Sequence, residues 1–219
     1  MRLALGSIFA LGFGLAHAAT VPVPAYDPVV AAPSETATLS GGCFWGMQGV
    51  YEHVRGVEHV YAGYTGGAAA TAQYDIVSTG TTGHAESVQI IFNPKVISYG
   101  RILQIYFAVA ADPTELNYQG PDSGTQYRSE IWVDSPEQRQ IATGYIAQLT
   151  QARAFPAPIV VRVDAAMPFY KAEDYHQDFL VQHPDYPYIA INDAPKVKNL
   201  AQEFPQFYQS TAVTVFPQS

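Results

Sequence analysis

Cysteine is the residue that this chain most lacks: Cys43 is the only one among 219 residues. A single cysteine excludes an intrachain disulfide, a thiol-cluster zinc site and a Cys-x-x-Cys redox pair. Charge is sparse too, since Asp, Glu, Lys and Arg make up 14% of the chain, against roughly 25% in an average soluble protein. With 11 Lys and Arg and a net charge of −8, the chain has no basic footprint for nucleic acid or anionic lipid.

Apolar and aromatic residues are abundant instead. Hydrophobic residues make up 48% of the chain, and there are 15 Tyr and 11 Phe. This composition excludes a disordered chain, and the length is typical of one domain with appendages. Any redox chemistry that the chain performs must use one sulfur.

The first 18 residues have the pattern of a signal peptide. Arg2 precedes an apolar run from Leu3 to Leu15, and Ala16-His17-Ala18 is a small-x-small cleavage signal. The alternatives are a buried helix or a membrane anchor, but the run is shorter than the about 20 apolar residues that a span needs. We expect an exported protein, with the periplasm as its compartment. Residues 19–34 contain four prolines and predict a semi-extended linker, and residues 35–219 form a single domain.

Hydrophobic periodicity predicts the order β-α-β-β-α-β, followed by α-β-α. This order is that of an α+β fold, a ferredoxin-like split βαβ plait, with C-terminal extensions. Helices then form one layer of a two-layer sandwich, and the last 35 or so residues form an ordered tail that wraps around the domain. The strands are predicted at residues 36–40, 57–64, 86–92, 128–133 and 159–163, and the helices at 43–54, 98–109, 136–153 and 171–182.

Cys43 lies where a strand, two glycines and a helix meet. Backbone N–H groups at a helix start stabilise an anion, so a thiolate there is expected to have a lowered pKa and to act as a nucleophile. The alternative is a small buried hydrophobe, as free cysteines often are. The two interpretations are about even on the residues alone, and the flanking Gly41 and Gly42 and the exported context favour reactivity.

Glu86 begins the clearest predicted strand. It shares parity with Val88, Ile90 and Phe92, so its carboxyl is expected on their apolar face, desolvated, with a raised pKa. A carboxyl that stays protonated near neutral pH is a candidate proton donor. The alternative is a frayed strand end with Glu86 in solvent, which is the commoner place for a lone glutamate.

Aromatic residues surround the candidate thiol in the sequence. Phe44 and Trp45 follow Cys43 directly, and three adjacent helical residues cannot all face one core, so at least one ring is expected beside the sulfur. Most of the tyrosines are expected to be structural. Tyr74 and Tyr127 differ because each lies in a polar loop near a Gly-rich stretch.

Several motifs occur together in a specific order, and with them the chain closely resembles the A class of peptide methionine sulfoxide reductases over residues 36–205. The set is far more specific than any one of its members. The motifs are Gly41-Gly42-Cys43-Phe44-Trp45-Gly46, Gly63-Tyr64-Thr65-Gly66-Gly67, Gly83-His84-Ala85-Glu86, Asp112-Pro113, Gly124-Thr125-Gln126-Tyr127-Arg128-Ser129 and Pro168-Phe169-Tyr170-Lys171-Ala172-Glu173-Asp174-Tyr175-His176-Gln177.

The resemblance implies reduction of the S epimer of methionine sulfoxide, free or in oxidised proteins, by the domain at residues 35–219. It implies no metal and no organic cofactor. Sulfoxide reduction needs a sulfur nucleophile and a proton for the departing oxygen. The implied roles are nucleophile for Cys43, acid for Glu86, hydroxyl donors for Tyr74 and Tyr127, polar support for Asp122, and a slot for the substrate methyl for Phe44 and Trp45.

The chain departs from many of these reductases in having no second cysteine. Position 78 is a serine, and the tail from Tyr186 to Asp193 contains no cysteine. The tail resembles that of the one-cysteine branch of the family. A sulfenic acid on Cys43 must therefore be recycled by an outside thiol, from a thioredoxin-like or other donor. The usual His before Asp112-Pro113 is Ala111 here. We expect a monomer that binds neither nucleic acid nor, after signal cleavage, membrane.

Three other functions compete with reduction. Cys43 with His84 as its base would make a cysteine hydrolase, although an Asn or Asp that orients the histidine is not evident. A second alternative is a binding module with an aromatic groove and an inert thiol. A metal site at Glu173, His176 and Asp178 is weaker, because a di-iron bundle needs more acidic partners, and we interpret these residues as a solvated helix face and a structural histidine.

Overall fold

The structure is a computed structural model and describes residues 21–217; the predicted signal peptide lies outside the described residues. The strands are β1 (Glu35–Ser40), β2 (Val57–Thr65), β3 (Ala85–Phe92), β4 (Tyr118–Gln119), β5 (Asp122–Ser123), β6 (Glu130–Val133), β7 (Arg162–Ala165) and β8 (Tyr170–Lys171). The α-helices are α1 (Phe44–Glu52), α2 (Tyr74–Val77), α3 (Tyr99–Ile105), α4 (Pro136–Gln151), α5 (Phe179–Gln182) and α6 (Ala194–Glu203).

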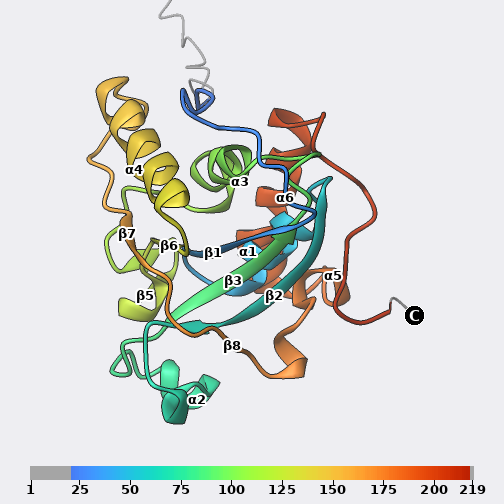
Figure 1. The fold of residues 1–219 in the computed structure, drawn as a ribbon. Coiled ribbons are helices and arrows are strands. Elements are labelled where there is room, and N and C mark those ends of the chain that lie inside the picture. Colours follow the sequence, from blue (N-terminus) through green and yellow to red (C-terminus); the bar gives the residue numbers. More distant parts are fainter. Residues whose placement is uncertain (1–20, 218–219) are drawn as a thin grey trace, which may run out of the picture.

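The main sheet has the strand order β7-β6-β1-β3-β2-β8. Its neighbours pair antiparallel except β6 and β7, which are parallel. Helix α1 connects β1 to β2, and α4 connects β6 to β7 (Figure 1). The predicted α+β class is confirmed.

Side chains of the strands alternate between a helix-covered face and a more open face. On β3, Val88, Ile90 and Phe92 are fully buried, whereas Gln89 and Ile91 are half-buried. Helix α1 packs on the buried face against β2 and β3, and Figure 1 shows α1, α3 and α6 behind the sheet. The apolar residues at helical spacing along α1 and just after it are all buried: Met47, Val50, Tyr51 and Val54.

The helix predicted over residues 171–182 is wrong. Tyr170 and Lys171 pair with β2 as an edge strand, a 3-10 turn follows at Asp174–His176, and α5 has four residues. The reason lies in tertiary contacts. The buried Gln177 side chain donates to the carbonyls of Ala62 and Ala172 and accepts the N–H of Ala62, which fastens the segment to the sheet edge.

Other boundaries shift for similar reasons. Strand β7 begins at Arg162 rather than at 159, because its parallel register pairs Glu130 with Arg162. The helix predicted to 109 becomes a π-helical turn over Tyr106–Ala110. Ser135 caps α4 by accepting the N–H of Gln138, and the Gln138 side chain accepts the N–H of Asp134.

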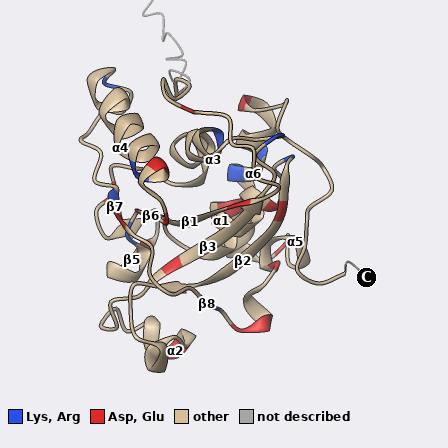
Figure 2. Cartoon of the chain, viewed as in Figure 1, with Lys and Arg blue, Asp and Glu red and all other residues tan. Residues whose placement is uncertain are grey.

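The segment before β1 lies along helices α3 and α4 without forming a helix or strand of its own. Asp27 accepts hydrogen bonds from the Ser98 hydroxyl and the Gly100 N–H, and the Tyr145 hydroxyl donates to the carbonyl of Pro22. Lys and Arg residues are few and scattered over several elements (Figure 2). Within residues 21–217, no helix is both long and apolar enough to cross a bilayer.

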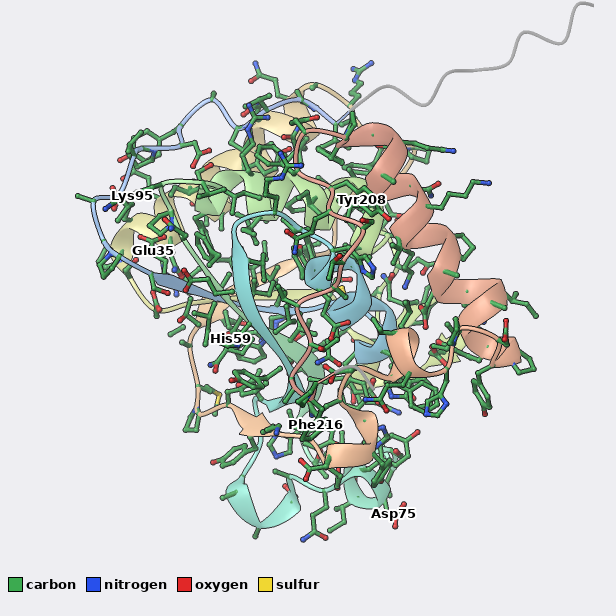
Figure 3. All side chains as sticks on the ribbon, turned by 90° about the vertical axis from the view of Figure 1, so that its right-hand side faces the viewer. Glu35, His59, Asp75, Lys95, Tyr208 and Phe216 are labelled. Atoms are coloured by element: carbon green, nitrogen blue, oxygen red, sulfur yellow. The ribbon has the colours of Figure 1, made fainter. Side chains whose placement is uncertain are left out.

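Residues 204–217, which we call the C-terminal strap, run from the end of α6 back across the molecule. Tyr208 forms a bridge with Val54, and the N–H of Val213 donates to the carbonyl of Glu52. Farther along, the N–H groups of Val215 and Phe216 both donate to the Asp178 carboxylate, at 2.8 and 2.9 Å. Tyr208 and Phe216 mark the two ends of this path in Figure 3.

Glu52 predicts a pH dependence of stability. Its carboxyl is fully buried beside Asp178, and burial together with the Asp178 charge raises its pKa well above the ordinary value of 4.5. The folded state therefore holds this proton more tightly than the unfolded chain, so stability falls as pH rises above about 4.5. We expect Glu52→Gln to remove that loss, and its melting temperature relative to wild type to rise between pH 5 and 9.

The rise in the melting temperature should reach at least 2–4 °C, roughly what 1 kcal/mol gives in a domain of this size. Scanning calorimetry at a series of pH values measures it. The exposed Glu58, changed to Gln, is the matched control and should follow wild type at every pH. A difference between Glu52→Gln and wild type that stays constant with pH contradicts the assignment.

Candidate active site

Cys43 occupies the cap position directly before α1. Gly42 precedes it with φ +88°, a conformation that favours glycine, and a Cβ at Gly42 would lie 2.6 Å from Cβ of Gln119. The tight turn is therefore specific to glycine for both conformational and steric reasons. It leaves Cys43 partly exposed at the helix start, while Phe44 is buried.

Glu86 lies beside this helix start. Its side chain is 2% exposed, on the face of β3 that its parity with Val88 predicts. Its Oε2 atom accepts a hydrogen bond of 3.0 Å from the backbone N–H of Phe44, the residue after the cysteine. Burial raises the pKa of Glu86 to about 8 even though the Phe44 N–H lowers it. The carboxyl is therefore mostly protonated at neutral pH.

The predicted lowering of the Cys43 pKa is wrong for the unliganded site. Burial raises the pKa of the thiol well above its usual value of 9.0, and nearby Glu86 and Asp193 raise it further. A backbone hydrogen bond at Trp45 lowers it but does not prevail. The physical reason is that two acidic side chains, Glu86 and Cys43, lie at the start of the same helix. The Phe44 N–H is directed at Glu86, and the neighbouring carboxyls disfavour a second negative charge.

Tyr74 and Tyr127 approach the same point from two different loops. Tyr74 begins α2, and Tyr127 ends the 3-10 turn Thr125–Tyr127. Both are half-buried; burial raises the pKa of each hydroxyl, and Glu86 and Cys43 both add to the shift. Both tyrosines are therefore protonated donors at neutral pH and lie close enough to Glu86 and Cys43 to sense their charge.

Asp122, the fifth predicted catalytic residue, belongs to the two-residue strand β5, which pairs with β4. Its carboxylate accepts a hydrogen bond from the Tyr188 hydroxyl and contributes to the raised pKa values of Cys43 and Tyr127. The structure thus brings all five predicted catalytic side chains around one thiol; their chemical roles stay predictions.

The two aromatic residues after Cys43 take different directions. Phe44 is buried and contacts Tyr64 and His176, with ring centroids 5.8 and 5.0 Å away. Trp45 is partly exposed and stacks on Phe179 at 3.9 Å, while its indole N–H donates to Nδ1 of His176. Trp45 is therefore the ring that remains at the surface near the sulfur, held by a hydrogen bond and a stacked neighbour.

Sequence reasoning missed three residues of the site. Glu173 accepts hydrogen bonds from the Tyr64 hydroxyl at 2.8 Å and the Tyr74 N–H at 3.0 Å, so it fixes the start of α2. Tyr188 and Asp193 come from the tail, and both interact electrostatically with Cys43. No local pattern identifies them, because they reach the site by long-range folding.

Asp193 also explains the last glycine of the first motif. The aspartate is fully buried against α1, where a Cβ on Gly46 would collide with its carboxylate. Lys196 lies 3.3 Å from its Oδ1 atom. A glycine at position 46 is needed so that this carboxylate can approach the helix.

The side chains that suggested other functions are engaged elsewhere. His84 is buried, accepts the N–H of Gly67 at Nδ1, and has its Nε2 atom 3.0 Å from the carbonyl of Ala68, so its ring holds a loop rather than serving Cys43 as a base. The three side chains of the candidate metal site have different hydrogen-bond partners: Tyr64 for Glu173, Trp45 for His176 and Val215 for Asp178. Over residues 21–217, no three His, Cys, Asp or Glu side chains are grouped as a metal would require.

Comparison of the chain with known proteins identifies its family. The family model described as "Peptide methionine sulfoxide reductase" matches residues 35–208, most of the chain. The chain belongs to the peptide methionine sulfoxide reductase family. A curated relative from Mesorhizobium japonicum, peptide methionine sulfoxide reductase MsrA 2, is 55% identical over 193 residues, 88% of this chain and 99% of the relative. The MsrA 2 of Synechocystis is 47% identical over 84% of this chain and 86% of its own length.

Solved structures of the reductase family agree with the fold. The crystal structure of Mxr1 from Saccharomyces cerevisiae in reduced form matches with a TM-score of 0.62 and 30% identity, covering 73% of this chain and 91% of that one. Methionine sulfoxide reductase A of Corynebacterium diphtheriae matches with a TM-score of 0.59, also at 30% identity, over 69% of this chain and 76% of its own. The family assignment overturns the hydrolase and binding-module alternatives.

Proposed function

We propose that the protein reduces the S epimer of methionine sulfoxide, free or in oxidised proteins, and so repairs oxidised methionine. The observation that carries this proposal is the protonated carboxyl of Glu86, hydrogen-bonded to the N–H of the residue that follows the only cysteine. A sulfoxide oxygen can leave only when it is protonated, and this acid lies beside the nucleophile. The family to which the chain belongs supports the same activity.

The first half-reaction uses the site as follows. The hydroxyls of Tyr74 and Tyr127 and the acid of Glu86 donate to the sulfoxide oxygen, which makes the substrate sulfur electrophilic. Glu86 gives its proton to the oxygen while Cys43 attacks that sulfur, and the thiol proton replaces the one that Glu86 has given up. The S–O bond breaks and the oxygen passes to the Cys43 sulfur. The products are methionine and a Cys43 sulfenic acid, so the substrate sulfur gains the two electrons that the cysteine sulfur loses.

The second half-reaction needs a donor outside the chain, because the sequence has no other cysteine. Two molecules of thiol return Cys43 to its reduced form and leave as a disulfide and water. A thioredoxin-like protein or a small thiol can supply them. Trp45, held by His176 and Phe179, is the proposed wall for the substrate methyl group, with Phe44 beneath it.

Three further assignments belong to this proposal. In the central strand order β6-β1-β3-β2, each strand is antiparallel to its neighbours, and α1 connects β1 to β2. We assign these elements to a split βαβ plait of the ferredoxin type. We also propose an exported monomer. The export signal rests on the sequence of residues 1–18 alone.

Chiral analysis of racemic methionine sulfoxide tests the proposal. With excess dithiothreitol, the protein should consume half of the racemate and leave the R epimer, because a fixed aromatic wall and fixed donors accept one arrangement at the chiral sulfur. Chromatography on a chiral phase gives both epimers over time. Consumption of both epimers at one rate, or of neither, rejects the proposal.

A further inference from the structure

A cavity of about 260 Å³ opens on one side of Cys43 and is the feature that the first half-reaction does not use. It is walled by the end of the π-helical turn after α3, by the loop over residues 112–122, and by the tail. Its polar walls come from Asp112, Glu115, Asp122, Asn192 and Lys196. Glu86, Tyr74, Tyr127, Phe44 and Trp45 are not among its lining residues. The cavity therefore shares Cys43, Asp122 and Tyr188 with the site, whereas the three proton donors lie outside its lining.

The cavity has a built wall rather than a loose loop. Gln119 is buried, accepts the N–H of Asp112 at 2.9 Å, and donates to the Asp112 carbonyl at 2.6 Å and the Ser129 hydroxyl at 3.2 Å. These bonds connect the two ends of the loop over residues 112–119. The Tyr188 hydroxyl of the tail donates a hydrogen bond to Asp122 at the end of the same loop, so this bond joins two walls of the cavity. Both walls are therefore held in place next to the sulfur.

We infer that this cavity is the site where a small external thiol binds and attacks the oxidised Cys43, an inference that rests on the proposed function. A thiolate attacks a divalent sulfur from the side opposite to the leaving group. In the proposed reaction the sulfenic oxygen points to Glu86 and the tyrosines, so the attacking sulfur must come from the other side. We assign this approach to the cavity because its lining includes Cys43 and none of the three proton donors.

The chemistry balances with the groups present. A thiol RSH loses its proton and forms an S–S bond to Cys43, while the Cys43 S–O bond breaks and the oxygen leaves as water with a proton from Glu86. The carboxylates on the cavity walls are the acceptors for the thiol proton. A second RSH then attacks the mixed disulfide, which releases RSSR and the Cys43 thiol. Two thiols are oxidised, and the sulfenic acid is reduced.

The charges on the walls select the kind of thiol. Three carboxylates line the cavity, and its one basic side chain, Lys196, already lies 3.3 Å from Asp193. Carboxylate-bearing thiols are repelled by this arrangement, and thiols with an ammonium or a neutral arm are favoured. The volume, near the lower limit for small-molecule sites, also suits a short thiol.

Filling the cavity tests the location of the site. The protein is oxidised with one equivalent of methionine sulfoxide, mixed with 2-mercaptoethanol, and quenched, and mass spectrometry follows the loss of the sulfenic acid. We expect Asn192→Phe to slow this recycling by at least tenfold, since misplacing a reactant by about 1 Å can cost about a hundredfold. The burst of methionine should slow by much less. Asn199→Phe, an exposed position in the same helical segment, is the matched control and should recycle like wild type.

Changing a wall charge tests the selectivity. Glu115→Gln keeps the acceptor for the Gly120 N–H and removes one negative charge. The ratio of the recycling rate constants for cysteamine and mercaptoacetate should fall by about threefold or more in this variant, less at high salt. Intrinsic thiol reactivity cancels when the variant is compared with wild type. Glu137→Gln, exposed on α4, should leave the ratio at the wild-type value.

Equal recycling by Asn192→Phe and Asn199→Phe, or an unchanged thiol ratio in Glu115→Gln, overturns the inference. A wild-type protein that forms no methionine in the burst rejects the proposed reduction itself. The two failures therefore give different results in the same experiment.

Discussion

Cys43→Ser abolishes sulfoxide reduction and leaves the protein folded. Cys43 is the only sulfur nucleophile in the chain, and it lies against the acid and both hydroxyl donors. A serine hydroxyl fits the same space, but it cannot form a stable bond to the transferred oxygen as sulfur does. Methionine formation with dithiothreitol should fall to the level of buffer alone.

Two further measurements make this result specific. Circular dichroism and the melting temperature should match wild type, since serine has nearly the shape of cysteine and replaces it at a partly exposed position. Dimedone, which traps sulfenic acids, should label wild type after one turnover without reductant and should not label Cys43→Ser. Methionine formation by the serine variant above the buffer level would show that the oxygen goes elsewhere.

Glu86→Gln reduces the rate of the methionine burst by about a hundredfold or more, the usual cost of losing a general acid. The amide oxygen of glutamine can still accept the Phe44 N–H at the position where Glu86 accepts it at 3.0 Å. The turn and α1 should therefore stay in place, and the loss is one of proton donation. Rapid quench of a single turnover measures the burst directly.

The protonation of Glu86 can also be observed without turnover. Because its pKa is raised to about 8, Glu86 is protonated below that pH and ionised above it. In infrared spectra, the carbonyl band of a protonated carboxylic acid should fade in wild type as pH rises through about 8. The wild-type minus Glu86→Gln difference isolates this band from that of Glu52. A near-native burst in the variant, or no such band, would place the acid elsewhere.

The raised pKa values of Cys43 and Glu86 follow from the tertiary structure and not from the helix start alone. A helix start by itself predicts an ionised thiol, but Glu86 takes the first N–H group of α1 and adds a carboxyl beside the sulfur. In the resting site both groups hold their protons. In the proposed mechanism the thiol loses its proton only after the sulfoxide has engaged the acid, so Cys43 is unreactive until substrate binds.

Local sequence patterns were sufficient where a residue's role depends on near neighbours. The parity of Glu86 with Val88 placed its carboxyl on the buried face, and Gly42 marked the turn that presents Cys43. The stripe from Met47 to Val54 identified the buried side of α1. Each of these depends on periods of two or 3.6 residues, which a chain carries in its own sequence.

Patterns failed where distant contacts outweigh propensity. The segment over residues 171–182 has helical residues, yet the Gln177 side chain connects it to β2 with two hydrogen bonds to Ala62. Glu173 accepts the N–H of Tyr74 from a position 99 residues farther along the chain. The Asp193 carboxyl packs against Gly46 from a still greater distance in the sequence.

The sequence by itself determined that one thiol follows a glycine turn, that the Glu86 carboxyl lies on the buried face of its strand, and that any disulfide with Cys43 needs a second molecule, because one cysteine and a strand parity allow few arrangements. Only the tertiary structure decided the directions in which the pKa values of the two groups shift and the cavity beside the thiol. Those properties depend on desolvation and on charges that Asp122, Asp193 and Lys196 bring from distant parts of the chain, and no local pattern encodes the distances between them.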